Sequence, residues 1–253
     1  TFIDLGVKKL RITGGEPLVR KNIMQLFSSL GKKLGHGLEE LTLTTNGSQL
    51  DRYAKDLFAN GVRRINVSLD SLNKDKFKKI TRIGDFDKVI KGIMAAKQTG
   101  LKVKINTVAL KGINNNEILD LVNWCGENKF SLTFIEVMPM GEVGEQRVDQ
   151  YMPLTEVKSL IQTKYSISDD ALRTGGPARY VHCHETDQKI GFITPHTHNF
   201  CELCNRVRIT CTGEMYMCLG QQDKANLKIP LRKSENNELL KDAIYEAIAR
   251  KPK

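Results

Sequence analysis

The stretch Lys9-Leu10-Arg11-Ile12-Thr13-Gly14-Gly15-Glu16-Pro17 begins the repeating sequence pattern that decides the fold. It is a short β-rich run that ends in a glycine pair, and apolar residues at helical spacing follow it, among them Ile23, Phe27 and Leu30. The same order of strand, polar turn and amphipathic segment repeats to about residue 138, which is typical of parallel βα units. The predicted strands are residues 9–13, 41–45, 65–69, 103–108 and 132–137.

Strands joined by helices require right-handed crossovers, so the sheet is predicted to be an open doubly wound sheet or part of a barrel. Residues 1–5, followed by Gly6 and a strand, resemble the tail of a helix whose preceding strand is missing. We therefore expect the chain to begin inside the first βα unit.

The repeating pattern of strand, turn and amphipathic segment ends after Gly141 and Gly144, and a different organisation is predicted beyond them. A helix is expected at 154–165, followed by two hairpins, 178–183 with 189–194 and 207–210 with 215–218. The predicted domains are a partial α/β body over 1–165 and a small β-rich module over 166–253.

Composition is that of a soluble globular protein, with 253 residues, 40% of them hydrophobic and 27% charged. No apolar run approaches the ~20 residues that cross a bilayer, so no membrane association and a cytoplasmic location are expected. Six cysteines in such a chain favour metal or catalytic thiols over disulfides. The net charge of +10 suits polyphosphate or nucleic acid, although the lysines are mostly dispersed.

The cysteines Cys201, Cys204 and Cys218 predict a metal site, because a two-residue spacer lets two thiolates approach one metal from a single turn. Arg206 and Arg208 alternate beside them. With His198 as a fourth ligand, the same cysteines would instead form a zinc site in a nucleic-acid-binding module. Against that alternative, the α/β body lacks aromatic stacking segments.

Function in parallel βα folds collects at the carboxyl ends of the strands. Lys104 and Asn106 alternate on one predicted strand and therefore share a face, and an inward lysine calls for an anionic partner. Arg11 would be a second inward cation. Together with Arg206 and Arg208 these groups suit a triphosphate, because guanidinium forks bind phosphate bidentately.

The chain resembles the GTP 3′,8-cyclase family of molybdenum cofactor biosynthesis, which belongs to the radical S-adenosylmethionine superfamily. The segments that carry the resemblance run in order over almost the whole chain: 10–18 (LRITGGEPL), 43–47 (LTTNG), 65–70 (INVSLD), 134–138 (FIEVM) and 200–210 (FCELCNRVRIT) with Cys218. The resemblance implies a partial (βα)6 TIM-type barrel, here lacking its first strand, and a C-terminal iron–sulfur module.

The resemblance also implies the ligands of individual residues. S-adenosylmethionine contacts fall on Gly15, Ser68 and Met138. GTP contacts fall on Arg11, Thr44, Lys104, Arg206 and Arg208. The ligands of a second [4Fe-4S] cluster fall on Cys201, Cys204 and Cys218, leaving one iron open for GTP. In the family, a 5′-deoxyadenosyl radical takes hydrogen from C3′ of GTP, and the sugar radical then attacks C8 of guanine.

Further expectations follow from the family. Its Cys-x3-Cys-x2-Cys motif for the first [4Fe-4S] cluster does not occur in these 253 residues, so the chain as given is not expected to generate the radical. The family implies a further [4Fe-4S] cluster in the full-length protein. Expected partners are an electron donor, a downstream cyclic pyranopterin monophosphate synthase and a second copy in a homodimer. Cys211 stands where relatives carry a small or polar residue.

A nearer alternative is another radical enzyme with an auxiliary cluster, for instance one that modifies peptides. Such enzymes generally carry more cysteines in the C-terminal module and lack the Cys-Asn-Arg-x-Arg run that spans 204–208.

Overall fold

The computed structural model describes residues 1–138, 149–172, 176–195, 204–218 and 222–252. It divides into two compact units. The larger unit is Val7–His198, and the smaller unit joins Thr1–Gly6 to Asn199–Lys253.

One eight-stranded sheet forms the larger unit. Its strands, in spatial order, are β1 (Lys9–Ile12), β2 (Glu40–Thr45), β3 (Arg64–Ser68), β4 (Lys102–Ala109), β5 (Ser131–Glu136), β8 (Gln188–Ile193), β7 (Arg179–Cys183) and β6 (Ile167–Asp170). Neighbouring strands from β1 to β8 pair in parallel, whereas β8, β7 and β6 pair antiparallel. All five predicted parallel strands are therefore present.

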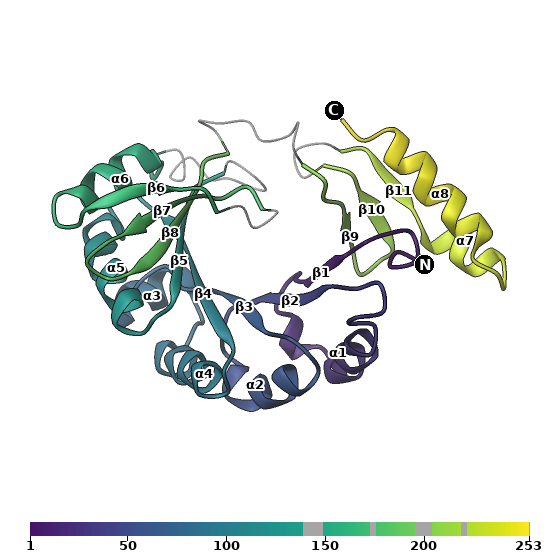
Figure 1. Ribbon diagram of the computed structural model, residues 1–253, viewed down its shortest axis with the longest axis horizontal. Helices are drawn as coiled ribbons and strands as arrows, with labels where there is room; N and C mark the ends of the chain where they lie inside the picture. Colours follow the sequence, from purple (N-terminus) through teal and green to yellow (C-terminus); the bar gives the residue numbers. More distant parts are fainter. Residues whose placement is uncertain (139–148, 173–175, 196–203, 219–221, 253) are drawn as a thin grey trace. The chain divides into compact units, whose positions relative to one another are not determined.

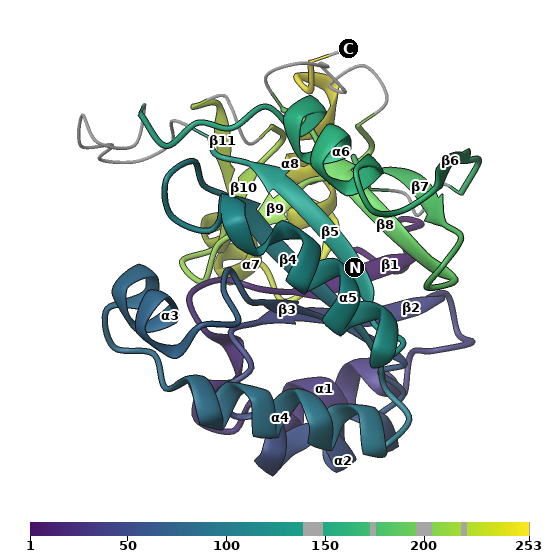
Figure 2. The ribbon, with the colours of Figure 1, turned by 90° about the vertical axis from the view of Figure 1, so that its left-hand side faces the viewer.

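Helices cover one face of this sheet (Figures 1 and 2). They are η1 (Pro17–Val19), α1 (Ile23–Gly31), α2 (Leu50–Ala59), α3 (Lys74–Thr81), α4 (Phe86–Gln98), η2 (Asn115–Glu117), α5 (Ile118–Glu127) and α6 (Leu154–Gln162). Side chains alternate along each strand, so one set meets the helices. That set is apolar and fully buried, as Leu43, Ile65, Ile105 and Phe134 show.

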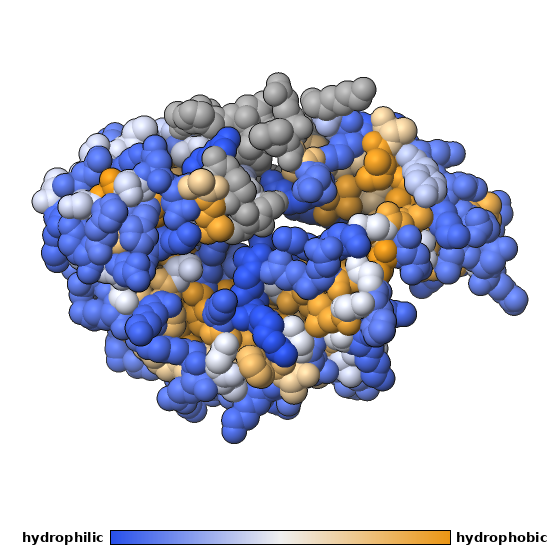
Figure 3. Space-filling view, viewed as in Figure 1, coloured by the Kyte–Doolittle hydropathy of each residue, from blue (hydrophilic) through white to orange (hydrophobic). Residues whose placement is uncertain are grey.

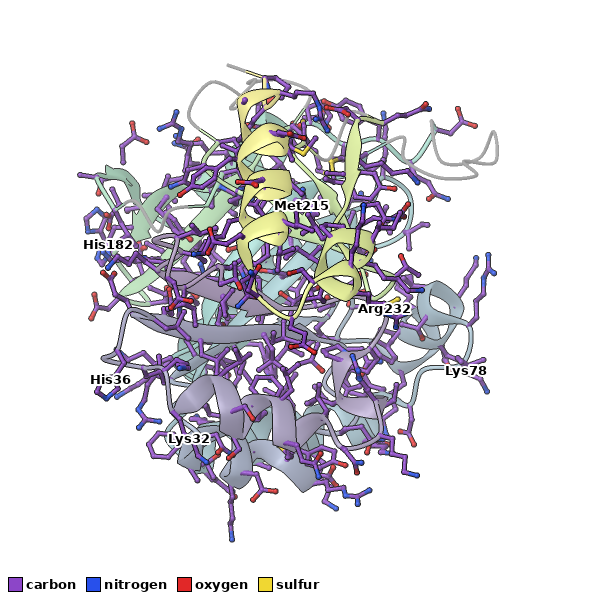
Figure 4. All side chains as sticks on the ribbon, turned by 90° about the vertical axis from the view of Figure 1, so that its right-hand side faces the viewer. Lys32, His36, Lys78, His182, Met215 and Arg232 are labelled. Atoms are coloured by element: carbon purple, nitrogen blue, oxygen red, sulfur yellow. The ribbon has the colours of Figure 1, made fainter. Side chains whose placement is uncertain are left out.

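The smaller unit has its own sheet and core. Its elements are β9 (Arg208–Ile209), β10 (Glu214–Tyr216), β11 (Lys224–Asn226), α7 (Lys228–Lys233) and α8 (Glu238–Ala249). Met215 lies beside α8 and packs with Leu240 and Ile244 of that helix (Figure 4). Apolar side chains gather over these strands and α8 (Figure 3). Phe2 and Leu5 from the start of the chain pack against the same core.

Both predicted hairpins form, but the first of them does not belong to a separate module. β8 pairs with β5 in parallel and thereby joins the hairpin to the large sheet. The compact units consequently divide near residue 199. The division into a partial barrel over 1–165 and a C-terminal iron–sulfur and GTP-binding module over 166–253 remains a prediction. No helix among the described residues has the length and apolar character needed to cross a membrane.

Candidate active site

The sheet face away from the helices is lined with polar side chains. Paired residues on neighbouring parallel strands point to the same side, so the register identifies them. One row consists of Thr44, Asn66, Lys104 and Ser131, on β2 to β5. The next row consists of Ser68, Asn106, Thr133 and Gly191, on β3, β4, β5 and β8. Strands of a parallel sheet usually read as apolar on both faces, so this polar face marks a site.

Several polar atoms of this face are buried without a partner. Asn66 is 4% exposed and Thr133 is 1% exposed. Asn66 Oδ1, Asn106 Oδ1 and Thr133 Oγ1 find no hydrogen-bond partner within the described part of the chain. An unsatisfied buried polar atom costs about 1–3 kcal/mol, so a ligand that supplies donors here would recover that free energy.

The loop after β1 is built around Glu16. Its carboxylate accepts hydrogen bonds from the Thr45 hydroxyl at 2.7 Å, the Asn46 amide at 2.6 Å and the Leu18 amide at 3.0 Å. Glu16 therefore ties the β1 loop to the end of β2. Beside it, a Cβ added to Gly15 would meet no atom within 4 Å, so a ligand can approach the Gly15 backbone closely.

Asp70 organises the carboxyl ends of β3 and β4. Its Oδ1 accepts from the Val108 amide at 2.8 Å, and burial raises the pKa of the Asp70 carboxyl. The N-cap of α3 is Asn73 and not Asp70, because the Asn73 side chain accepts hydrogen bonds from the amides of Asp75 and Lys76. Ser68 precedes this turn, and Met138 follows β5. Gly15, Ser68 and Met138 thus all follow or end strands at the same edge of the sheet.

A basic pocket of about 280 Å³ lies at the amino ends of the same strands. Its lining includes Lys9, Arg64, Lys102, Lys104, Tyr180 and Lys189. Glu40 also lines it and binds Arg64. The hydrogen bond from Arg64, together with the charges of Lys9 and Arg11, holds the pKa of the Glu40 carboxyl below its usual value. Arg11 thus lies within electrostatic reach of this cluster.

A second constellation belongs to the smaller unit. Cys204 and Cys218 are half-buried free thiols. Burial and the charge of Arg206 lower the pKa of the Arg208 guanidinium, and the charges of the two cysteines oppose this shift only in part. Burial makes the largest single contribution to the pKa of Cys204 and raises it. Hydrogen bonds and charge from Arg206, together with the charge of Lys251, outweigh burial and lower the pKa of this thiol. A thiol biased towards thiolate fits metal or cluster ligation.

Part of this constellation lies outside the described residues. Cys201 and His198 fall there, so the structure tests neither the third cysteine nor the zinc alternative. Within the described ranges, no group of three or more histidine, cysteine and acidic side chains is placed to hold a metal ion. Cys211 is exposed.

Sequence reasoning placed Arg11, Lys104 and Asn106 on one face, and the resemblance added Thr44 as a GTP contact. Both missed Asn66, Ser131 and Thr133. The available signal was the alternation of polar residues along β3 and β5, which repeats the pattern seen on β4. Tyr180 was also missed, because its contact depends on pairing between segments far apart in the sequence.

Two protein families match the chain. Residues 1–125 match the Radical SAM superfamily, and residues 130–253 match the family Molybdenum Cofactor Synthesis C.

Several curated relatives match the whole chain, and each is named GTP 3′,8-cyclase. The protein of Paracoccus denitrificans (strain Pd 1222) is 60% identical over 253 residues, which cover 100% of this chain and 74% of the relative. The protein of Mesorhizobium japonicum is likewise 60% identical, over 76% of its length. The protein of Brucella ovis is 58% identical, over 74% of its length.

Solved structures share the fold at low sequence identity. Streptococcus suis SuiB matches with a TM-score of 0.61 and 18% identity, over 99% of this chain and 57% of that chain. The same protein bound to S-adenosylmethionine matches with a TM-score of 0.60 and 19% identity, over 88% and 53%. This chain thus spans about half the length of SuiB, and the likeness supports the fold alone.

Proposed function

The chain belongs to the GTP 3′,8-cyclase family of radical S-adenosylmethionine enzymes, and from this premise we propose which residues perform each part of the reaction. The function is conversion of GTP to (8S)-3′,8-cyclo-7,8-dihydroguanosine 5′-triphosphate in molybdenum cofactor biosynthesis. Identity of 60% over the whole chain supports this function over the peptide-modifying and nucleic-acid-binding alternatives.

One observation of the structure carries the assignment of the site. The face of the sheet away from the helices buries unpartnered polar atoms of Asn66 and Thr133 beside the cation of Lys104. A folded protein tolerates that cost where a ligand that supplies hydrogen-bond donors later satisfies these atoms, and the Lys104 cation favours an anionic group on the same ligand. We assign GTP contacts in the larger unit to Arg11, Thr44 and Lys104.

Arg206 and Arg208 are the GTP contacts that we assign to the smaller unit. Two arginines at alternating positions present guanidinium forks, which bind phosphate oxygens or the edge of a base bidentately. Their proximity to Cys204 and Cys218 would bring this end of the substrate to a cluster.

S-adenosylmethionine is assigned to Gly15, Ser68 and Met138 at the carboxyl ends of the strands. The open space around Gly15 fits close backbone contact, and the Ser68 hydroxyl can donate to a ligand. When bound and reduced, this cofactor supplies the radical that takes hydrogen from C3′ of GTP. The residues of the chain hold and orient the two ligands, while the radical chemistry belongs to the cofactor.

A [4Fe-4S] cluster is assigned to Cys201, Cys204 and Cys218. The lowered pKa of the Cys204 thiol supports ligation, because iron binds the thiolate form. A further [4Fe-4S] cluster in the full-length protein, an electron donor, the downstream synthase, a homodimer and a cytoplasmic location remain predictions from the family.

The substrate assignment is tested by replacing Arg206 and Arg208 individually with alanine. Loss of a charge-assisted hydrogen bond of about 1.5–3 kcal/mol predicts GTP binding roughly 10- to 100-fold weaker by equilibrium dialysis. The iron content should stay unchanged, because neither arginine is assigned as a cluster ligand.

Arg232→Ala is the matched control, since Arg232 is an exposed arginine on α7 of the same unit (Figure 4). It should bind GTP as the parent protein does. Parental GTP affinity in both Arg206→Ala and Arg208→Ala would refute the assignment.

A further inference from the structure

Lys104 differs from its neighbours in the basic pocket by the partner that holds it. Arg64 and Lys9 pair with the Glu40 carboxylate, and Lys189 pairs with Asp170 at 2.9 Å. The Lys104 ammonium instead donates a hydrogen bond to the phenol oxygen of Tyr180.

A neutral partner leaves the positive charge of Lys104 uncompensated. A carboxylate would neutralise the ammonium, whereas a phenol oxygen accepts one N–H and leaves two further donors. Within the described residues Lys104 forms no second hydrogen bond or ion pair. The contact therefore orients the charge without cancelling it.

We propose that Tyr180 positions Lys104 to bind the triphosphate of GTP. Tyr180 acts through the lysine and is a positioning residue, not a catalytic one. The inference rests on the proposed function, because it takes GTP as the anion that Lys104 meets.

Small residues between the two strands leave room for this contact. Two strands, β5 and β8, separate Tyr180 on β7 from Lys104 on β4. Three of the residues that lie between them on the same face are small: Ser131 and Thr133 on β5 and Gly191 on β8. Gly191 pairs directly with Tyr180, and a Cβ added there would lie 3.0 Å from the ring and 2.8 Å from Thr133 Oγ1. The absent side chain leaves room for the ring to cross the sheet.

Burial holds the ring in this position. Tyr180 is 4% exposed, and the Lys104 ammonium lies 4.8 Å from the centre of its ring. A long, flexible lysine stem would otherwise sample many rotamers, and fixing it before the ligand arrives lowers the entropy lost on binding. The pocket is lined by five cationic side chains, those of Lys9, Arg64, Lys102, Lys104 and Lys189, and by one carboxylate, that of Glu40, so its net charge suits an anion.

The test measures GTP affinity by equilibrium dialysis of the anaerobically reconstituted protein carrying Tyr180→Phe. Removing one neutral hydrogen-bond acceptor is expected to weaken GTP binding about 3- to 10-fold. Guanosine, which has no phosphate, should bind Tyr180→Phe and the parent protein alike.

A double-mutant cycle with Lys104→Met separates positioning from general packing. If Tyr180 acts through the ammonium, Tyr180→Phe should change GTP affinity less than 2-fold, or about 0.4 kcal/mol, once Lys104 is methionine. Tyr165→Phe is the matched control. Tyr165 is similarly buried, at 6% exposed, and its hydroxyl has no partner among the described residues, so GTP affinity should be unchanged.

The outcomes are distinguishable. Parental GTP affinity in Tyr180→Phe, or an equal loss in the Lys104→Met background, would overturn the inference while leaving the proposed function intact. Parental GTP affinity in Lys104→Met would instead count against the assignment of Lys104 to GTP. If Tyr180→Phe folds poorly, Gly191→Ala displaces the ring by a different route, and a phosphate-dependent loss of affinity is expected there as well.

Discussion

At the scale of single residues, one carboxylate outside the site holds a buried turn together. Glu117 in η2 accepts hydrogen bonds from the Ser71 hydroxyl and the Leu72 amide, both at 2.8 Å, and pairs with Lys76 at 2.9 Å. These contacts fix the loop that follows Asp70 at the end of β3. Burial makes the largest individual contribution to the Glu117 pKa and raises it, but the three donors together lower it.

A lowered pKa in the folded state predicts that Glu117 stabilises the protein above the pKa of an unfolded glutamate, about 4.3. That contribution should be lost as the pH falls through the lower folded-state pKa. Glu117→Gln should cost about 1–3 kcal/mol in the free energy of unfolding near pH 7, because the amide nitrogen cannot accept a hydrogen bond. The difference from the parent protein should shrink in acid, as urea unfolding at pH 7 and at low pH would reveal.

Glu156→Gln provides the control, because Glu156 is an exposed glutamate in the first turn of α6. Its replacement should change the free energy of unfolding by less than about 0.5 kcal/mol. An undiminished difference between Glu117→Gln and the parent protein at low pH would contradict the role of the charge.

At the scale of elements, α4 and α2 approach each other closely at one glycine. Gly92 lies buried in the middle of α4, and an added Cβ would stand 2.4 Å from the carbonyl oxygen of Gly47 and 3.1 Å from Leu50 Cβ. Because the obstructing oxygen belongs to the backbone, it cannot rotate away. The glycine therefore sets how near the two helices lie beneath the sheet.

Replacing Gly92 with alanine has two opposing effects on the stability of the fold. Alanine favours a helix over glycine by about 1 kcal/mol, but overpacking against backbone costs about 1–3 kcal/mol. Since the gap of 2.4 Å is far below van der Waals contact, we expect overpacking to dominate and the urea midpoint to fall. Lys88→Ala, at an exposed position of the same helix, should leave the midpoint nearly unchanged. A raised midpoint in Gly92→Ala would show that propensity outweighs packing here.

At the scale of the whole molecule, the two compact units bury separate cores. The core of the smaller unit contains Met215, Leu240 and Ile244, and Cys204 and Cys218 belong to the same unit. Small units often depend on a metal centre for part of their stability, because they bury little apolar surface. The proposed cluster would serve the smaller unit in this way as well as binding substrate.

Cys204→Ala is therefore expected to abolish most iron and sulfide binding after anaerobic reconstitution, measured by chemical assay of both elements. Cys125→Ala is the control. Burial raises the pKa of Cys125 and keeps it a neutral thiol in the core of the larger unit, so its removal should leave the iron content unchanged. Tightly bound zinc without sulfide in the parent protein would contradict the cluster.

Local pattern was sufficient to predict much of this architecture. Strands β1 to β5 and both hairpins were predictable because side-chain alternation and turn residues are local features of a few positions. The same alternation along a strand identified Arg11 and Lys104 as inward-facing cations. The family resemblance added the ligand roles that no spacing could supply. Those roles, and the partial barrel, stay predictions.

What the sequence by itself determined was the set of parallel βα units and the alternation that turns polar side chains to one face of the sheet, since both depend on neighbouring residues. Only the tertiary structure decided that β8 pairs with β5. This pairing places Tyr180 beside Gly191, where its phenol oxygen accepts a hydrogen bond from Lys104. The two residues stand 76 positions apart. Such a contact arises from strand pairing and close packing over the whole sheet, and no local period in the sequence records it.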